Sequence, residues 1–214
     1  MRGPARGGAS GVIAYPLGET HRVALLAVAA DAIGRALTGS VGALPEPGDD
    51  PALAQPGASF VSLARGEALL RCTGSLVATE ALVASVARNA GNAASADPRL
   101  PAITADDFAV MSITVSVLSP LAPVRARSWR DVRRAVRPGH DGLLVEAGDH
   151  RATLLPSAWA QLPSPDQFLD VLWHKAGLRP RDWLPGTAVR RYSTEELTDP
   201  GPRAAGSDRS LAWA

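Results

Sequence analysis

The amino-acid sequence predicts an α+β fold in which a mostly antiparallel sheet is covered by flanking helices. Residues 111–118 alternate apolar and hydroxyl side chains, the pattern of a strand with one buried face. Two pairs of short apolar segments, 59–64 with 68–73 and 142–147 with 150–155, enclose glycine-containing turns typical of hairpins. Segments of helical period lie between these strand pairs, and such interleaving favours antiparallel strands packed against helices.

The N-terminal half is expected to contain a helix, a loop, a hairpin and a second helix, in that order. Apolar residues repeat at helical spacing over 21–37, and Gly39 can adopt the left-handed conformation that ends a helix. The proline-rich segment 41–57 has no period and is predicted to be a loop. After the hairpin of residues 59–73, Thr79 is the expected N-cap of a helix with an apolar stripe.

The C-terminal half is expected to add a short helix, the alternating strand, a second hairpin, a helix and a last strand. Thr104 begins a capping-box sequence that predicts one helical turn before the alternating strand. After the hairpin of residues 142–155, the Ser-Pro pair at 164–165 predicts a helix that continues to Lys175. Residues 187–192 are predicted to form the last strand.

One domain is predicted over residues 18–195, because strand and helix signals run through this region without a polar linker. Residues 1–17 are rich in Gly, Ala and Arg, and residues 196–214 are rich in Pro, Gly and Ser. Neither end shows a period, so both are expected to be disordered tails.

Charge and cysteine content narrow the classes of function. The 22 basic and 21 acidic side chains leave a net charge of only +1, and the arginines are scattered along the chain. Such a chain has no long-range field to attract nucleic acid or an anionic membrane, and no apolar stretch approaches the roughly 20 residues that span a bilayer. The single cysteine, Cys72, excludes an intramolecular disulfide and fits a reducing compartment. A soluble cytoplasmic protein that binds neither nucleic acid nor membrane is therefore expected.

No cofactor and no metal site is expected within the chain. The sequence lacks a phosphate-binding loop ending in Lys-Ser/Thr, a Gly-x-Gly-x-x-Gly pattern and a Gly-x-Ser-x-Gly elbow. Its four histidines form no close pair at metal-ligand spacing, and one cysteine cannot complete a tetrahedral ligand set.

Cys72 is the candidate nucleophile. It follows Arg71 at the end of a predicted strand and precedes Gly74 and Ser75, at a turn of the kind that often borders a pocket. A nearby guanidinium would favour the reactive thiolate. Alternatively, Cys72 is a small buried hydrophobic residue, the commoner role of a free cysteine. Neighbouring residues on a strand face opposite sides, so pairing with Arg71 requires a bend in the backbone.

Two further groups of polar side chains are candidates. His140 lies in a Pro-Gly-His-Asp-Gly loop before the second hairpin and could carry a proton, or it is simply a solvated turn residue. Thr114 and Ser116 lie on the hydroxyl face of the alternating strand and could line a groove for a polar ligand, or they could simply face water.

An ordered series of short motifs resembles the AMMECR domain family over roughly residues 20–195. The most specific is Leu70-Arg71-Cys72-Thr73-Gly74-Ser75 after a hydrophobic strand, which is similar to the family's Leu-Arg-Gly-Cys-Ile-Gly. The further matches are Asn89-Ala90, Asp97-Pro98-Arg99, Val115-Ser116-Val117-Leu118-Ser119-Pro120, Gly139-His140-Asp141-Gly142-Leu143, Leu154-Leu155-Pro156 and Lys175-Ala176-Gly177-Leu178. The family's glycine between Arg and Cys is missing here, which puts in question whether Arg71 and Cys72 reach one surface.

The resemblance implies an AMMECR-like α+β fold with a larger and a smaller subdomain and a cleft near the Arg-Cys motif. It also implies similarity to protein A of the AmmeMemoRadiSam system, whose partners are a Memo-like protein and a radical SAM protein. Any metal or iron–sulfur cluster would then belong to those partners. The resemblance attaches no secure activity to the domain itself.

Two hypotheses follow for the function. In the first, the chain is an enzyme or enzyme subunit that binds a small polar substrate, with Cys72 as nucleophile or redox thiol and His140 as a further catalytic residue. The expected substrate-binding residues are Arg71, Gly74, Ser75, Thr114 and Ser116. In the second, the chain is a non-catalytic adaptor that docks the Memo-like or radical SAM protein. Exposure of Cys72 separates the two, because a nucleophile must be reachable and an adaptor tolerates a buried thiol.

Overall fold

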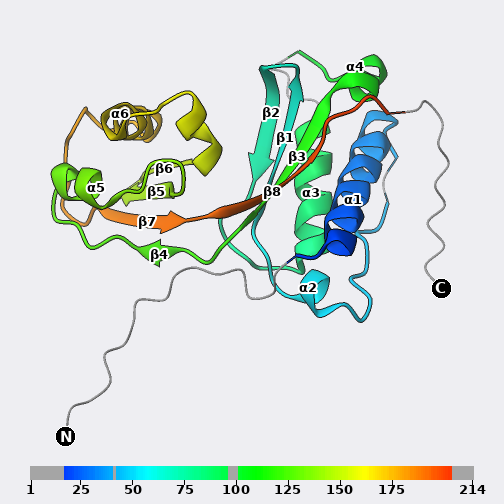
Figure 1. The fold of residues 1–214 in the computed structure, drawn as a ribbon, viewed down its shortest axis with the longest axis horizontal. Helices are drawn as coiled ribbons and strands as arrows, with labels where there is room; N and C mark the ends of the chain where they lie inside the picture. The colour runs from blue at the N-terminus through cyan, green and yellow to red at the C-terminus, as the bar shows by residue number, and fades with distance from the viewer. Residues whose placement is uncertain (1–16, 41, 96–100, 204–214) are drawn as a thin grey trace, which may run out of the picture. The chain divides into compact units, whose positions relative to one another are not determined.

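The computed structural model describes residues 17–40, 42–95 and 101–203, which divide into two compact units. The larger unit contains the described residues up to 117 together with 196–203, and the smaller unit contains residues 118–195. Each unit has its own four-stranded sheet (Figure 1). The predicted α+β class with antiparallel strands and flanking helices is confirmed, and the one sheet expected from the sequence is two.

The sheet of the larger unit contains both arms of the first predicted hairpin and the alternating strand. Its strands are β1 (Ser59–Arg65), β2 (Ala68–Gly74), β3 (Ser112–Leu118) and β8 (Thr194–Asp199), in the order β2-β1-β3-β8. β1 pairs antiparallel with both β2 and β3. Gly66 closes the β1–β2 turn with φ +57, a conformation that glycine adopts without steric cost.

Helices cover one face of this sheet. In α3 (Leu82–Ala94), the hydroxyl of Ser85 lies 2.9 Å from the hydroxyl of Ser59, and the amide of Asn89 donates to the Ser59 carbonyl at 3.0 Å. α1 (Glu19–Leu37) packs against α3 (Figure 1). Side chains alternate along a strand, so Ser59 shares this helix face with the buried residues Val61 and Leu63. The opposite face of the sheet is called the outer face below.

The described strands continue past residue 195, the C-terminal boundary predicted from the sequence. β8 continues to Asp199 and forms the edge of the sheet beside β3. Arg203 extends the ordered region further: its Nη1 donates to the carbonyls of Phe108 at 2.9 Å and Met111 at 2.6 Å. These carbonyls lie near the end of α4 (Ala105–Val110), so part of the expected tail is bound to the fold. Residues 1–16 and 204–214 lie outside the described residues.

The smaller unit has a sheet of order β4-β7-β5-β6 and its own apolar core. Its elements are β4 (Ala122–Pro123), α5 (Trp129–Ala135), β5 (Gly142–Ala147), β6 (His150–Leu154), the 3-10 helix η1 (Pro156–Ala160), α6 (Pro165–Lys175) and β7 (Ala188–Tyr192). The second hairpin, the helix ending at Lys175 and the last predicted strand are confirmed. α5, β4 and η1 were not predicted.

Local capping signals explain where two helices begin. Thr104 and Ser164 each accept a backbone N–H at the third helical position, and both make the reciprocal capping-box contact, which the sequence predicts for Thr104. The helix predicted after the first hairpin is present as α3, but its N-cap is Ala81 rather than Thr79. There the first helical N–H, that of Leu82, donates to the carbonyl of Gln55 at 2.9 Å, so the chain rather than a side chain caps the helix.

Two other sequence expectations fall in the remaining segments. The predicted loop of residues 41–57 contains a short helix, α2 (Pro51–Ala54), which Asp50 caps by accepting from Ala52 N at 2.9 Å. The Asp-Pro-Arg motif at 97–99 lies outside the described residues.

Candidate functional site

Four polar side chains form a row across the outer face of the larger unit. Ser62 of β1 lies opposite Cys72 of β2 on one side and opposite Thr114 of β3 on the other. Thr114 Oγ1 in turn lies 3.1 Å from Thr198 Oγ1 of β8. Directly opposed residues in antiparallel strands have Cβ atoms about 4.5–5.5 Å apart, so each member is a side-chain neighbour of the next. We call these four residues the thiol–hydroxyl row.

Cys72 is the exposed end of this row. Its side chain is open to solvent, which excludes the alternative that it is a buried apolar residue. β2 is the edge strand of the sheet, so one side of Cys72 faces no further strand among the residues that the structure describes. The thiol is therefore reachable by a ligand that also contacts the hydroxyl of Ser62.

Arg71 does not join Cys72 on the outer face. It pairs with Leu63, whose buried side chain belongs to the helix face, and the register runs without interruption from Arg71 to Cys72. A β-bulge in β2 leaves Leu70 without a partner, one residue too early to turn Arg71 toward the thiol. The guanidinium donates to the carbonyls of Leu70 and Pro101, and its Nε is buried without a hydrogen-bond partner. The expected contact between this cation and the thiol is not formed.

Gly74, Phe60 and Ser116 form a second row on the outer face, and Gly74 has a packing role there. A Cβ at Gly74 would lie 2.2 Å from Cγ of Phe60 and 2.5 Å from the carbonyl oxygen of Ser59, so only glycine lets the aromatic ring lie over β2. Ser116, opposite Phe60, is buried, and its hydroxyl reaches Glu196 Oε1 at 3.5 Å. Of the two hydroxyls predicted to line a groove, Thr114 is partly exposed and Ser116 is not.

Ser75 uses its hydroxyl locally. Its Oγ accepts from the backbone N–H of Val77 and donates to the Val77 carbonyl, both at 3.1 Å. Its backbone N–H donates to the Ser59 carbonyl at 3.0 Å. These bonds shape the turn that follows β2, which is a common use of serine in turns.

His140 belongs to the smaller unit, where it is exposed in a turn. Its backbone N–H donates to the Arg137 carbonyl at 3.1 Å, and Gly139 before it has φ +78. A role for His140 as proton carrier stays a prediction.

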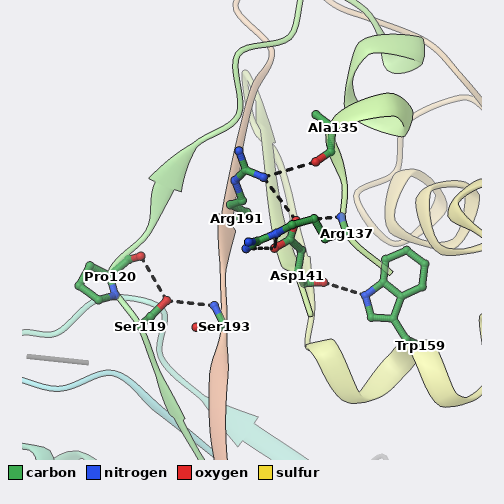
Figure 2. A network of polar contacts seen from close by, with 8 residues as sticks. All are labelled: Ser119, Pro120, Ala135, Arg137, Asp141, Trp159, Arg191 and Ser193. Carbon is green, nitrogen blue, oxygen red and sulfur yellow. Dashed lines mark hydrogen bonds and ion pairs between the residues drawn. The ribbon is translucent and has the colours of Figure 1, made fainter. Parts of the chain in front are cut away.

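The residue after His140, Asp141, is a buried charged side chain that was not among the candidates from the sequence. Its carboxylate is fully buried and accepts from Arg137 three times: from the backbone N–H at 2.9 Å, from Nε at 2.9 Å and from Nη2 at 2.6 Å. Arg191 Nη1 lies 3.6 Å from Oδ2 of Asp141, the oxygen that also accepts from the backbone N–H of Arg137. Figure 2 shows the carboxylate between these two arginines. This environment holds the pKa of Arg137 above its ordinary value, first through the hydrogen bonds to Asp141 and then through its charge.

The Asp141 network also locks the adjoining core. The indole N–H of Trp159 donates to the Asp141 carbonyl at 2.8 Å, and the ring of Trp159 stacks on Phe168 at a centroid distance of 4.0 Å. Asp141 thus ties the start of β5 to η1 and α6. We assign it a structural role in the smaller unit, because none of its acceptor capacity is aimed at solvent.

The described residues contain neither a candidate metal cluster nor a candidate membrane-spanning helix. In residues 17–40, 42–95 and 101–203, no three His, Cys, Asp or Glu side chains cluster in a way that could hold a metal ion. Within the same part of the chain, no helix has the length and apolar character needed to cross a membrane. Absence of a cofactor stays a prediction.

Comparisons with known proteins cover the Asp141 network and three residues of the thiol–hydroxyl row, Cys72, Ser62 and Thr114. Residues 26–197 match the family model described as AMMECR1. A protein of Thermococcus gammatolerans is 33% identical over 171 residues, which cover 74% of this chain and 81% of that protein. A protein of Methanothermobacter thermautotrophicus is 32% identical over 144 residues, which cover 66% of this chain and 75% of that protein. The crystal structure of uncharacterized protein PH0010 from Pyrococcus horikoshii is similar in fold, with a TM-score of 0.75 and 29% identity over 85% of this chain and 92% of that chain.

Proposed function

The chain belongs to the AMMECR1 family, and on that premise we propose that the outer face of its larger unit holds a small polar ligand against the thiol of Cys72. The observation that carries the proposal is the exposure of Cys72 at the end of a row of hydroxyls. A reachable thiol is the requirement that a nucleophile must meet and an adaptor need not.

The roles in this proposal follow from the chemistry of each side chain. Cys72, as the thiolate, is the nucleophile or redox group. The hydroxyls of Ser62 and Thr114 can each donate and accept a hydrogen bond, so they orient a ligand that carries hydroxyl, amide or carboxylate groups. Arg71 lies on the other face, so anchoring of an anion beside the thiol is not part of the proposal.

The cellular setting is proposed from the motif resemblance. We place the chain as protein A of the AmmeMemoRadiSam system, in the cytoplasm, where a reducing environment keeps Cys72 free. Its Memo-like and radical SAM partners would supply the metal chemistry, and this chain would present or process a polar substrate.

Alkylation of the native protein tests the proposal directly, because Cys72 is the one cysteine of the chain. Native Cys72 is expected to react with iodoacetamide at a rate close to that of the urea-unfolded protein. The small-molecule fraction of a cell extract is expected to slow this reaction, and Ser62→Ala and Thr114→Val are expected to reduce the protection. Ser157→Ala, in the smaller unit, is the matched control and should leave the protection unchanged.

Two outcomes would refute the proposal. If native Cys72 reacts only after unfolding, the thiol is not available to a substrate. If it reacts but no fraction of the extract protects it, the row is not a ligand site, and the adaptor hypothesis takes its place.

One observation favours that second function. β2 is an edge strand, and Leu69 within it is 64% exposed, which is the geometry that accepts a strand from a partner. An adaptor would dock the Memo-like or radical SAM protein here. Leu69→Lys should then abolish co-purification with those partners, whereas Val23→Lys, an equally exposed site on α1, should not. If the Leu69→Lys protein still co-purifies with those partners, docking through this edge is excluded.

A further inference from the structure

The smaller unit contains a hollow whose lining is dominated by arginine. Its volume is about 230 Å³, and its lining residues are Trp129, Arg130, Arg133, Arg134, Asp166 and Arg181. We call it the arginine hollow. It lies entirely within the smaller unit and shares no residue with the thiol–hydroxyl row.

The positive charge of the lining exceeds what its one carboxylate, that of Asp166, can neutralise. Four guanidinium groups face one carboxylate, a net formal charge of +3. Asp166 is shared, with Oδ2 at 2.8 Å from Arg133 and Oδ1 at 3.8 Å from Arg181. Among residues 101–203 and the other described segments, no ion-pair partner is found for Arg130.

A further carboxylate beside these arginines, that of Asp131, is engaged by the backbone. Asp131 reaches Arg134 only at 3.8 Å, and Arg134 is 75% exposed. The other oxygen of Asp131 accepts from the backbone N–H of Arg127 at 3.0 Å, and this hydrogen bond is the first cause of a lowered pKa for Asp131. Arg134 therefore keeps donors available for a ligand.

The fold holds the arginines in place with rigid elements. Arg130, Arg133 and Arg134 have the i, i+3, i+4 spacing that places them on one face of α5, which is anchored in the core by Trp129. Arg181 comes from the segment after α6, and its guanidinium lies 4.9 Å from the centroid of the Trp129 ring. Arg181 has φ +61, a left-handed conformation that is unfavourable for a non-glycine residue and persists only where the surroundings impose it.

We propose that the arginine hollow binds a compact polyanion of the diphosphate type. Clustered guanidinium groups repel one another unless an anion lies between them, and their planar donor pairs match phosphate oxygens in a bidentate manner. The hollow is smaller than the roughly 300–1,000 Å³ pockets that enclose drug-sized ligands, so it suits the diphosphate group and leaves the rest of a larger ligand outside. The near-neutral net charge of the whole chain hides this local excess.

Isothermal titration of the full chain with inorganic pyrophosphate tests the site, with ADP as a second probe to show whether a nucleoside adds affinity. Saturable binding of pyrophosphate is expected, tighter than that of inorganic phosphate or sulfate. Arg130→Gln and Arg134→Gln should each weaken it by about tenfold, the usual value of one charged hydrogen bond. Arg179→Gln removes an arginine that is 85% exposed and paired with Asp182 outside the hollow, so it should leave affinity within about twofold.

A further variant separates ligand binding from a structural role. Asp166→Asn removes the carboxylate charge from the lining and should tighten pyrophosphate binding severalfold, which a loss of structure could not do. The proposal is overturned if pyrophosphate gives no saturable binding, if Arg179→Gln weakens it as much as Arg130→Gln, or if sulfate binds equally well. Binding of RNA without binding of pyrophosphate would likewise overturn it, in favour of a nucleic-acid surface.

Discussion

Replacement of Asp141 by asparagine is expected to destabilise the smaller unit by about 2 kcal/mol. The substitution keeps the volume and removes only the charge, so the core around Trp159 stays filled. An amide can still accept from the backbone N–H of Arg137, but its NH₂ group would face the guanidinium donors that the carboxylate now accepts at 2.9 and 2.6 Å. Hydrogen bonds to charged groups are worth about 1.5–3 kcal/mol each. Because the Arg137 side chain is 56% exposed and can return to water, the value is discounted to about 2 kcal/mol for the pair.

The cost of removing the Asp141 carboxylate from water reduces the net stabilisation that the ion pair provides. A fully buried ion pair can contribute nothing, because removal of the charge from water costs as much as the pairing returns. The contacts on both oxygens decide in favour of the pair here, since Asp141 is bound by Arg137 three times and approached by Arg191 at 3.6 Å.

Urea unfolding monitored by tryptophan fluorescence reports on the stability of the smaller unit. Four of the five tryptophans, Trp129, Trp159, Trp173 and Trp183, lie in the smaller unit. With a urea m-value of about 2 kcal/mol per molar, a loss of about 2 kcal/mol lowers the midpoint by about 1 M. Asp149→Asn, in the exposed turn between β5 and β6, is the control and should shift it by less than about 0.3 M. An Asp141→Asn protein as stable as the parent would show that desolvation cancels the pairing.

Three other predictions follow from single contacts. Gly74→Ala should lower the free energy of unfolding by about 1–3 kcal/mol, because the new methyl overlaps the Phe60 ring and a backbone carbonyl. Gly74→Ala should cost less when it is introduced into Phe60→Ala than when it is introduced into the parent, and an equal loss in the two backgrounds would exclude the overlap with the ring as the cause. Arg203→Ala should cost about 2–3 kcal/mol by leaving the carbonyls near the end of α4 without their donor, as thermal unfolding monitored by circular dichroism would show; a melting temperature equal to that of the parent would mean that the segment is not bound in solution. In Asp131→Asn, the free energy of unfolding should fall less between neutral and acid pH than in the parent. The pKa of Asp131 is lowered in the folded state, so the contribution of its carboxylate to stability is present above the pKa of the unfolded state and is lost as the pH falls through the pKa of the folded state, below about pH 4. Urea midpoints that fall equally in the variant and the parent would contradict this.

Elements with a local cause could be predicted from the sequence. Thr104 and Ser164 begin helices because their hydroxyls cap backbone N–H groups three residues on, and this is legible in a four-residue window. The alternation over residues 111–118 likewise identified β3, because a half-buried strand needs a period of two. The sequence left open whether Cys72 is reachable or buried, and the edge position of β2 together with the exposure of the side chain decides this.

Which of these residues come into contact depends on the pairing of distant strands. Residues 196–199, which are predicted to begin a disordered tail because that end of the chain shows no period, belong to β8. They form a strand because β3, about 80 residues away along the chain, supplies the hydrogen bonds. The row from Cys72 to Thr198 depends on the pairing register of four strands, and the register of Leu63 with Arg71 keeps the guanidinium from the thiol. These relations are set by hydrogen bonds and packing between distant segments, which leave no mark on the composition of any one of them.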